Sequence, residues 1–212
     1  MTTNVLGLIF ARHGRTAWNL AGRYQGRSDP PLSPEGEADA RIVARKLSED
    51  RPAAIVASPS KRTMMTARIV GNLLGLSRIQ VDGRLLELAY GAWEGLTQAE
   101  IKARWPEQLR IWKHTPEAMR FPGGETLEQA RARLRAFARD GAALRDTDGP
   151  VLVVTHAGMV RLAMLEARNA PLSDFRRFEV GHEAVHRFRL RRDIAPARVS
   201  FSEMENDQCE LR

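Results

Sequence analysis

Three consecutive residues near the N-terminus have side chains suited to chemistry on an anion. Arg12, His13 and Gly14 directly follow an apolar run, residues 5–11, that has the length of a strand. The guanidinium of Arg12 offers a planar fork of donors for an oxyanion, and a neutral imidazole at His13 would be a nucleophile near pH 7. We expect Gly14 to let the backbone approach a ligand closely. Taken alone, the motif also fits a strand followed by a polar surface loop.

A second apolar run, residues 151–155, ends in the same way at His156, Ala157 and Gly158. Ligands of open α/β sheets bind outside the carboxyl ends of the strands. We therefore expect His13 and His156 to lie at the ends of neighbouring strands, within reach of one ligand. A hydrogen-bonded histidine at a strand end is the alternative interpretation of His156.

Further motifs occur in order along the chain. They comprise residues 9–19, 23–26 and 29–33 with Gly36, Ser58-Pro59 with Arg62-Thr63, Leu86-Glu87 with 90–95, 122–126, and 153–158. This set resembles the histidine phosphatase superfamily, also called the phosphoglycerate-mutase-like family, from Val5 to about Leu190. The resemblance implies a metal-independent enzyme that transfers a phosphoryl group to a histidine.

The resemblance also assigns roles to the reactive side chains. His13 would be the nucleophile and become a phosphohistidine, Arg12 and Arg62 would bind phosphate oxygens, and His156 would donate a hydrogen bond. Physical chemistry supports this assignment, since two nearby arginines disfavour the protonated form of His13 and keep a nucleophilic nitrogen available. Taken alone, Arg62 also fits a surface ion pair at a helix start.

Glu87 is the predicted general acid, and it matches the position of the family's proton donor. Leucines on both sides give it partly apolar surroundings, which favour the protonated form of a carboxyl group, as does a nearby phosphate. Glu94 is the rival, although its spacing fits a structural role better.

Four residues are predicted to contact the substrate around the phosphate: Asn19, Gln25, Gly26 and Ala157. A purely turn-forming role remains the alternative for Asn19 and Gln25. Arg15 departs from the family pattern, in which an acidic residue is usual, and it would add positive field near the entrance.

The remaining pattern predicts an α/β protein, a three-layer α/β/α sandwich with a mostly parallel sheet and an edge hairpin. Ser33 and Pro34 are typical of a helix start, and Gly75 of a helix end. The predicted strands are 5–11, 53–57, 79–81 and 151–155, with a hairpin over 183–190 and 197–201. The predicted helices begin at Ser33 with inner residues Ala38, Ile42, Val43 and Leu47, and near Arg62 with inner residues Thr66, Ile69, Val70, Leu73 and Leu74. A long helix over 126–144 and another over 159–168 complete the set.

An insertion interrupts this alternation of strands and helices at about residues 97–124. We expect residues 1–212 to form a single domain that includes it. Two helices, 97–105 and 107–114, predict a lid over the site, a common role for such segments. We expect the lid to set substrate choice through Trp105, Trp112, His114, Arg104, Arg110 and Arg120.

Composition narrows the class of protein. The net charge of +7 weakly favours a phosphorylated substrate. No nucleic-acid motif, membrane span or signal peptide is recognisable, so the sequence predicts a cytoplasmic enzyme without nucleic-acid or membrane partners. Cys209 is the single cysteine. His182 and His186 are spaced four apart on a strand-like pattern, too far apart to chelate one ion, so no metal site is predicted.

Three functions remain open. The favoured one is a phosphomonoester phosphatase that acts on a small phosphorylated metabolite and needs no cofactor. The alternative is a phosphoglycerate mutase that depends on 2,3-bisphosphoglycerate, although the short insertion and Ala157-Gly158 after His156 favour the phosphatase branch. A non-enzymatic anion-binding module is the third, and it would need neither nucleophile nor acid. The identity of the phosphate ester and a homodimeric state are left open.

Overall fold

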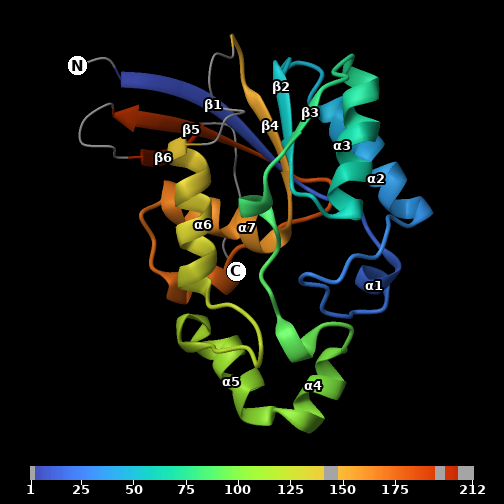
Figure 1. Ribbon diagram of the computed structural model, residues 1–212, viewed down its shortest axis with the longest axis vertical. Coiled ribbons are helices and arrows are strands. Elements are labelled where there is room, and N and C mark those ends of the chain that lie inside the picture. The colour runs from blue at the N-terminus through green and yellow to red at the C-terminus, as the bar shows by residue number, and fades with distance from the viewer. Residues whose placement is uncertain (1–2, 141–147, 194–198, 205–212) are drawn as a thin grey trace.

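The computed structural model describes residues 3–140, 148–193 and 199–204. Its centre is a six-stranded sheet with the order β3-β2-β4-β1-β5-β6 (Figure 1). β3, β2, β4 and β1 are parallel, whereas β5 is antiparallel to β1 and β6 to β5. The predicted mostly parallel sheet with an edge hairpin is therefore confirmed. The strands are β1 (Thr3–Arg12), β2 (Ala54–Ala57), β3 (Ile79–Val81), β4 (Val151–Thr155), β5 (Val185–Asp193) and β6 (Val199–Glu203).

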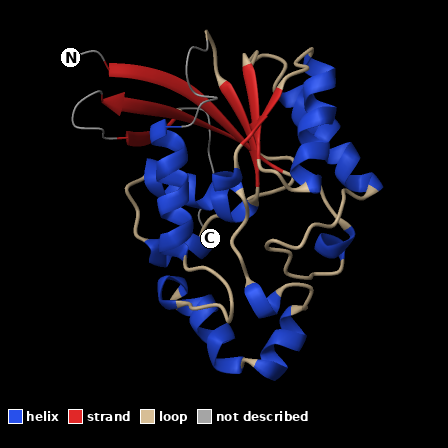
Figure 2. Cartoon of the chain, viewed as in Figure 1, coloured by secondary structure: helices blue, strands red, loops and turns tan. Residues whose placement is uncertain are grey.

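Helices cover both faces of this sheet (Figures 1 and 2). Successive residues of a strand point to opposite faces, so Leu8 and Phe10 of β1 join one buried cluster and Ile9 and Ala11 the other. α6 (Leu127–Asp140) and α7 (Ala157–Ala167) complete the first cluster, and α2 (Pro34–Lys46) and α3 (Lys61–Leu74) the second. The three-layer arrangement follows from this alternation.

The helix ends lie where the sequence predicts them. The Ser33 hydroxyl caps α2 by accepting from the Gly36 amide, and Gly75 ends α3 in the left-handed conformation. Two predicted inner residues are wrong, since Ala38 and Leu73 are exposed. Neighbouring helical residues point about 100° apart, and in α3 it is Leu74 that packs against the core.

The insertion contains α4 (Gln98–Arg104) and α5 (Pro106–His114), which project beyond the carboxyl ends of the strands (Figure 1). Trp112 of α5 stacks edge-on against Phe121 and Tyr90, so an aromatic cluster joins the lid to the body. Short elements complete the chain: α1 (Ala17–Leu20) and single 3-10 turns at Gly83–Leu85, Gly91–Trp93, Pro116–Ala118 and Leu172–Arg176.

Some predicted features lie outside the described residues. They are positions 141–144 of the long helix, positions 197–198 of the hairpin, and Cys209. Among the described helices, none combines the length and apolar character that crossing a membrane requires.

Candidate active site

A cavity of about 240 Å³ lies at the carboxyl ends of the strands. We call it the arginine cavity, because four arginines line it. Its lining residues are Arg12, His13, Asn19, Gly22, Arg23, Tyr24, Gln25, Gly26, Arg62, Glu87, Tyr90, Ala157 and Arg161. The structure thus brings together every predicted site residue except His156, which lies directly behind the lining.

His13 follows the last residue of β1, and its amide donates to Thr155 O of the neighbouring strand at 2.9 Å. Its Nδ1 donates to Gly14 O at 2.7 Å, which leaves Nε2 with the lone pair. Burial, followed by the charges of Arg62 and Arg12, holds the pKa of His13 well below its usual value. The residue is therefore neutral at pH 7, with a free lone pair at Nε2.

Gly14 is needed for a reason other than the expected one. A Cβ there would lie 2.0 Å from Gly36 O, and Gly14 does not line the cavity. The glycine allows the loop after β1 to pack against the first turn of α2, not to approach a ligand. The prediction for Gly14 was wrong in this respect.

Arg12 and Arg62 are held by backbone carbonyls. Arg12 donates from Nη1 to Val180 O at 2.7 Å, and Arg62 donates to Ser28 O and Gly26 O at 2.7 and 2.8 Å. The buried Nε of each arginine has no hydrogen-bond partner. Burial, then the charge of Arg161, lowers the pKa of Arg12 to about 10, so it remains a cation at neutral pH.

His156 is fully buried, with its ring centroid 5.3 Å from that of His13. This confirms that the two histidines lie at the ends of neighbouring strands. The Ser58 hydroxyl lies 2.9 Å from Nε2 of His156, and Nδ1 has no partner. With Ser58 as the donor, Nδ1 carries the proton and is a third unpartnered N–H beside His13.

Glu87 reaches the cavity from the segment that follows β3. Its carboxylate accepts from the Leu88 amide at 3.0 Å and from the Gly158 amide, in the first turn of α7, at 3.3 Å. A Cβ at Gly158 would lie 2.3 Å from Glu87 Oε1. The glycine of the second histidine motif is therefore what lets the carboxyl group approach so closely.

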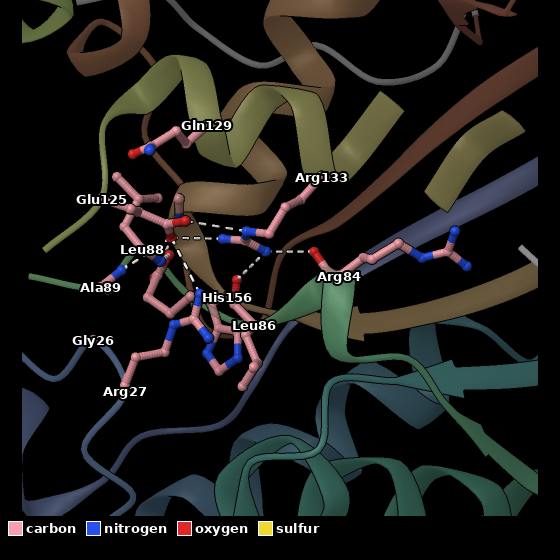
Figure 3. A network of polar contacts seen from close by, with 12 residues as sticks. Gly26, Arg27, Arg84, Leu86, Leu88, Ala89, Glu125, Gln129, Arg133 and His156 are labelled. Atoms are coloured by element: carbon pink, nitrogen blue, oxygen red, sulfur yellow. Dashed lines mark hydrogen bonds and ion pairs between the residues drawn. The ribbon is translucent and has the colours of Figure 1, made fainter. Parts of the chain in front are cut away.

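A polar network fixes the segment that carries Glu87 (Figure 3). Arg133 of α6 donates to the carbonyls of Arg84 and Leu86, and it forms a two-bond ion pair with Glu125. Glu125 in turn accepts from the Ala89 amide at 3.0 Å. We call this set the Arg133–Glu125 network, and it holds the chain on both sides of Glu87.

Glu94 has the structural role that its spacing indicates. Its carboxylate accepts from the amides of Arg27, Ser28 and Tyr90, and it does not line the cavity. It ties the loop that carries Gln25 and Gly26 to the segment after Glu87.

Arg15 adds no free charge at the entrance. It forms a two-bond ion pair with the buried carboxylate of Asp39 on α2, with contacts of 2.8 and 2.6 Å. The expectation of an added positive field was therefore wrong, because the pair is locally neutral.

Sequence reasoning missed five lining residues, Gly22, Arg23, Tyr24, Tyr90 and Arg161. Arg161 had a usable signal, since it follows Ala157 by four residues on α7 and so shares its face. It also missed His182, whose Nδ1 donates to His13 O at 2.8 Å.

The six lid side chains named above do not line the cavity. Trp112 is buried in the core, Trp105 packs against it, and Arg110 pairs with Glu107 on the same helix. That these side chains set substrate choice therefore stays a prediction, since none of them lines the cavity in this structure.

Metal ligands do not gather anywhere in the described part of the chain, where no group of three or more His, Cys, Asp or Glu side chains could hold an ion. His182 contacts His13, whereas His186 lies within β5.

The fold and this site define the class of protein. The chain belongs to the histidine phosphatase superfamily, whose branch 1 matches residues 8–198. The predicted family is thereby confirmed.

Individual relatives are phosphatases. Phosphoserine phosphatase 1 of Hydrogenobacter thermophilus is 34% identical over 168 residues, 79% of each chain. Glucosyl-3-phosphoglycerate phosphatase of Mycobacterium tuberculosis is 32% identical over 176 residues, 79% of this chain and 78% of the relative. A solved mycobacterial glucosyl-3-phosphoglycerate phosphatase, complexed with VO3, has a TM-score of 0.81 at 28% identity and covers 95% of this chain and 100% of that chain. Family and relatives together indicate a phosphatase, and hence a hydrolase.

Proposed function

We propose that the protein is a metal-independent phosphomonoester phosphatase that acts on a small phosphorylated metabolite through a phosphohistidine at His13. The observation that carries the proposal is the set of three buried nitrogens without partners, Nε of Arg12, Nε of Arg62 and Nδ1 of His156, of which the last is a donor when the Ser58 hydroxyl donates to Nε2. Buried donors in folded proteins are almost always bonded. Three of them around a neutral imidazole favour an anion that supplies the missing acceptors.

The chemistry takes two steps. In the first, His13 Nε2 attacks phosphorus, the bond to the leaving oxygen breaks, and Glu87 gives that oxygen its proton. In the second, the Glu87 carboxylate accepts a proton from water, the water oxygen attacks phosphorus, and inorganic phosphate leaves with His13 restored. Arg12, Arg62 and His156 stabilise the charge on the non-bridging oxygens in both steps.

The size of the cavity supports a small substrate. At about 240 Å³, it lies below the roughly 300–1,000 Å³ of pockets for drug-sized ligands. The phosphoserine and glucosyl-3-phosphoglycerate in the relatives' names support phosphate esters of metabolites as the class to test.

The test is phosphate release by the purified chain from a panel of phosphate esters, with and without a chelator and 2,3-bisphosphoglycerate. We expect release that neither additive changes, and none from the His13→Ala variant. Interconversion of phosphoglycerates without release would establish the mutase instead. Binding of phosphate without turnover would leave only an anion-binding module, and chelator-sensitive activity that a divalent ion restores would overturn metal independence.

A further inference from the structure

The peptide between His13 and Gly14 is held at both ends by side chains distant in sequence. Its carbonyl, His13 O, accepts from Nδ1 of His182 at 2.8 Å, and its amide, on Gly14, donates to the Thr66 hydroxyl of α3 at 3.1 Å. The next carbonyl, Gly14 O, accepts from Nδ1 of His13 at 2.7 Å. The position of Gly14 O, and with it the orientation of the His13 ring, depends on how this peptide is held.

His182 lies just before β5 and does not line the arginine cavity. Its ring packs edge-on against that of His13, with the centroids 5.6 Å apart and an interplanar angle of 67°. Two residues earlier, Val180 O accepts from Nη1 of Arg12 at 2.7 Å. One short segment before β5 therefore holds both members of the Arg12-His13 pair, and it does so without reaching the cavity.

The hydrogen bond of His182 has a fixed direction. A carbonyl oxygen has no proton to donate, so Nδ1 of His182 is the donor and His13 O the acceptor. Burial, then the charge of Arg12, lowers the pKa of His182 to about 4. The ring is therefore neutral at pH 7 and carries its single proton on Nδ1, where the bond to His13 needs it.

We propose that His182 is a positioning residue for phosphoryl transfer, whose bond to His13 O holds the backbone that keeps Nδ1 of His13 protonated and Nε2 free to attack. A neutral imidazole carries one ring proton, and the partner of one nitrogen decides which nitrogen holds it. If Gly14 O moves away from Nδ1, the proton is free to occupy Nε2, and that form has no lone pair facing phosphorus. The effect on turnover rests on the phosphatase function proposed above, whereas the tautomer of His13 does not.

The first test compares the His13 tautomer in the wild type, His182→Phe and His182→Asn. Phenylalanine keeps an aromatic ring beside His13 without the donor, and the asparagine amide offers an N–H near the place of Nδ1. Two-bond ¹H–¹⁵N NMR of the histidine rings reports the tautomer whether or not the protein is active, and His13→Ala assigns the signals. We expect only the Nδ1–H form in the wild type and in His182→Asn, and a mixture with the Nε2–H form in His182→Phe.

The second test is turnover of p-nitrophenyl phosphate by the same proteins. His182→Phe should lower kcat by about three- to tenfold, the scale of one hydrogen bond between neutral groups, and His182→Asn should restore it. KM should stay within about twofold, because His182 does not line the cavity. His114→Phe is the matched control, since it makes the same change at an exposed histidine of the lid, and it should alter neither the tautomer nor kcat.

The proposal fails if either the tautomer or kcat is unchanged in His182→Phe, or if the wild type already contains both tautomers. Equal losses in His182→Phe and His182→Asn would also overturn it, because they would assign the effect to packing of the imidazole and not to its donor.

Should His182→Phe fail to fold, Thr66→Val decides. It frees the Gly14 amide at the other end of the same peptide, so it should shift the tautomer in the same direction, and an unchanged tautomer would overturn the proposal. A wild type with the expected tautomer that hydrolyses no ester would instead refute the phosphatase function, and the positioning of His13 by His182 would stand.

Discussion

Arginines do opposite things in two neighbouring parts of this molecule. In the Arg133–Glu125 network, Arg133 donates from Nε and both terminal nitrogens to a carboxylate and two carbonyls (Figure 3). In the arginine cavity, Arg12 and Arg62 use only terminal nitrogens, and each leaves a buried Nε without a partner. Arg133, whose three side-chain nitrogens all donate, holds the chain in place. Arg12 and Arg62 each keep one buried N–H that has no acceptor.

The difference has an energetic meaning. A buried donor without a partner costs about 1–3 kcal/mol, whereas a bonded one is mildly stabilising. The cavity therefore holds polar groups at a cost to stability, which an anion bound there would recover. This contrast predicts that substitutions in the cavity affect chemistry, while those in the network affect stability and the position of Glu87.

The largest effect is expected from His13→Ala. Loss of the covalent route should remove turnover by many factors of ten, each worth about 1.4 kcal/mol of barrier. The free energy of unfolding should change little by comparison. Phosphate release and denaturant unfolding measure the two quantities, with the exposed His114→Ala as control. Turnover retained within a factor of ten of the wild type would exclude His13 as the nucleophile.

Next in size is Glu87→Gln. An amide cannot donate the proton that an alkoxide leaving group needs, so alkyl phosphates should react about 10²–10⁴-fold more slowly. p-Nitrophenyl phosphate, whose phenolate leaves without a proton, should lose much less. If good and poor leaving groups slow equally, Glu87 positions the phosphate, and the acid must be sought elsewhere.

Arg62→Met tests the cavity side of the contrast. Removal of one donor to the transferring phosphoryl group should lower kcat by about 10²–10³-fold on every ester, whatever its leaving group. The free energy of unfolding should change by at most about 1 kcal/mol, because the Asp29 carboxylate that loses its partner at 3.6 Å is 36% exposed and stays hydrated, and relief of the fully buried charge offsets the lost bonds to Gly26 and Ser28. Steady-state kinetics and urea unfolding of one preparation give both values.

Arg133→Met tests the Arg133–Glu125 network, and it should lower stability more, and activity less, than Arg62→Met does. The substitution leaves the partly buried Glu125 carboxylate and the carbonyls of Arg84 and Leu86 without their donor. The free energy of unfolding should therefore fall by about 2 kcal/mol. Activity should fall less than in Glu87→Gln and mainly on alkyl phosphates, since the network acts through Glu87. A stability loss in Arg62→Met as large as that in Arg133→Met would remove the distinction between the two clusters.

The prediction with the smallest effect on activity concerns the pH dependence of stability, and its residue lies outside both clusters. Burial lowers the pKa of His186 in β5 to about 4. Between pH 6.5 and 4 the unfolded chain binds a proton there that the folded chain does not, so stability falls as the pH falls, by up to about 3 kcal/mol for this residue. His186→Leu should flatten the dependence of unfolding free energy on pH, measured by urea unfolding at a series of pH values. An unchanged slope would mean that His186 binds protons equally in the folded and unfolded chains, and would contradict the lowered pKa.

The sequence predicted those parts of the site that depend on residues adjacent in the chain. Each strand that delivers a reactive group is a short apolar run that stops at its motif, so His13 and His156 could be placed at neighbouring strand ends. Glu87 was found by the motif around it. The residues next to Glu87 in the sequence do not reveal the contacts that hold it. Arg133 is 47 residues from Leu86, and Gly158 is 71 residues from Glu87.

The errors have a common physical cause. Arg15 and Gly14 were interpreted as facing a ligand, but each faces α2, through Asp39 and Gly36. The lid aromatics do not line the cavity in this structure, because burial of their large apolar surface draws them into the core. Partners distant in sequence decide where a side chain points, and one sequence does not specify them.

The most direct test of the account is the isomer of the phosphoenzyme. Nδ1 of His13 is engaged with Gly14 O, so the phosphoryl group must be carried on Nε2. We predict that enzyme quenched in alkali during turnover carries a base-stable, acid-labile phosphate on His13, with the ³¹P NMR signal of the Nε2 isomer, and that His13→Ala carries none. A label on Nδ1, on His156 or on Ser58, or no label in an active enzyme, would contradict the account.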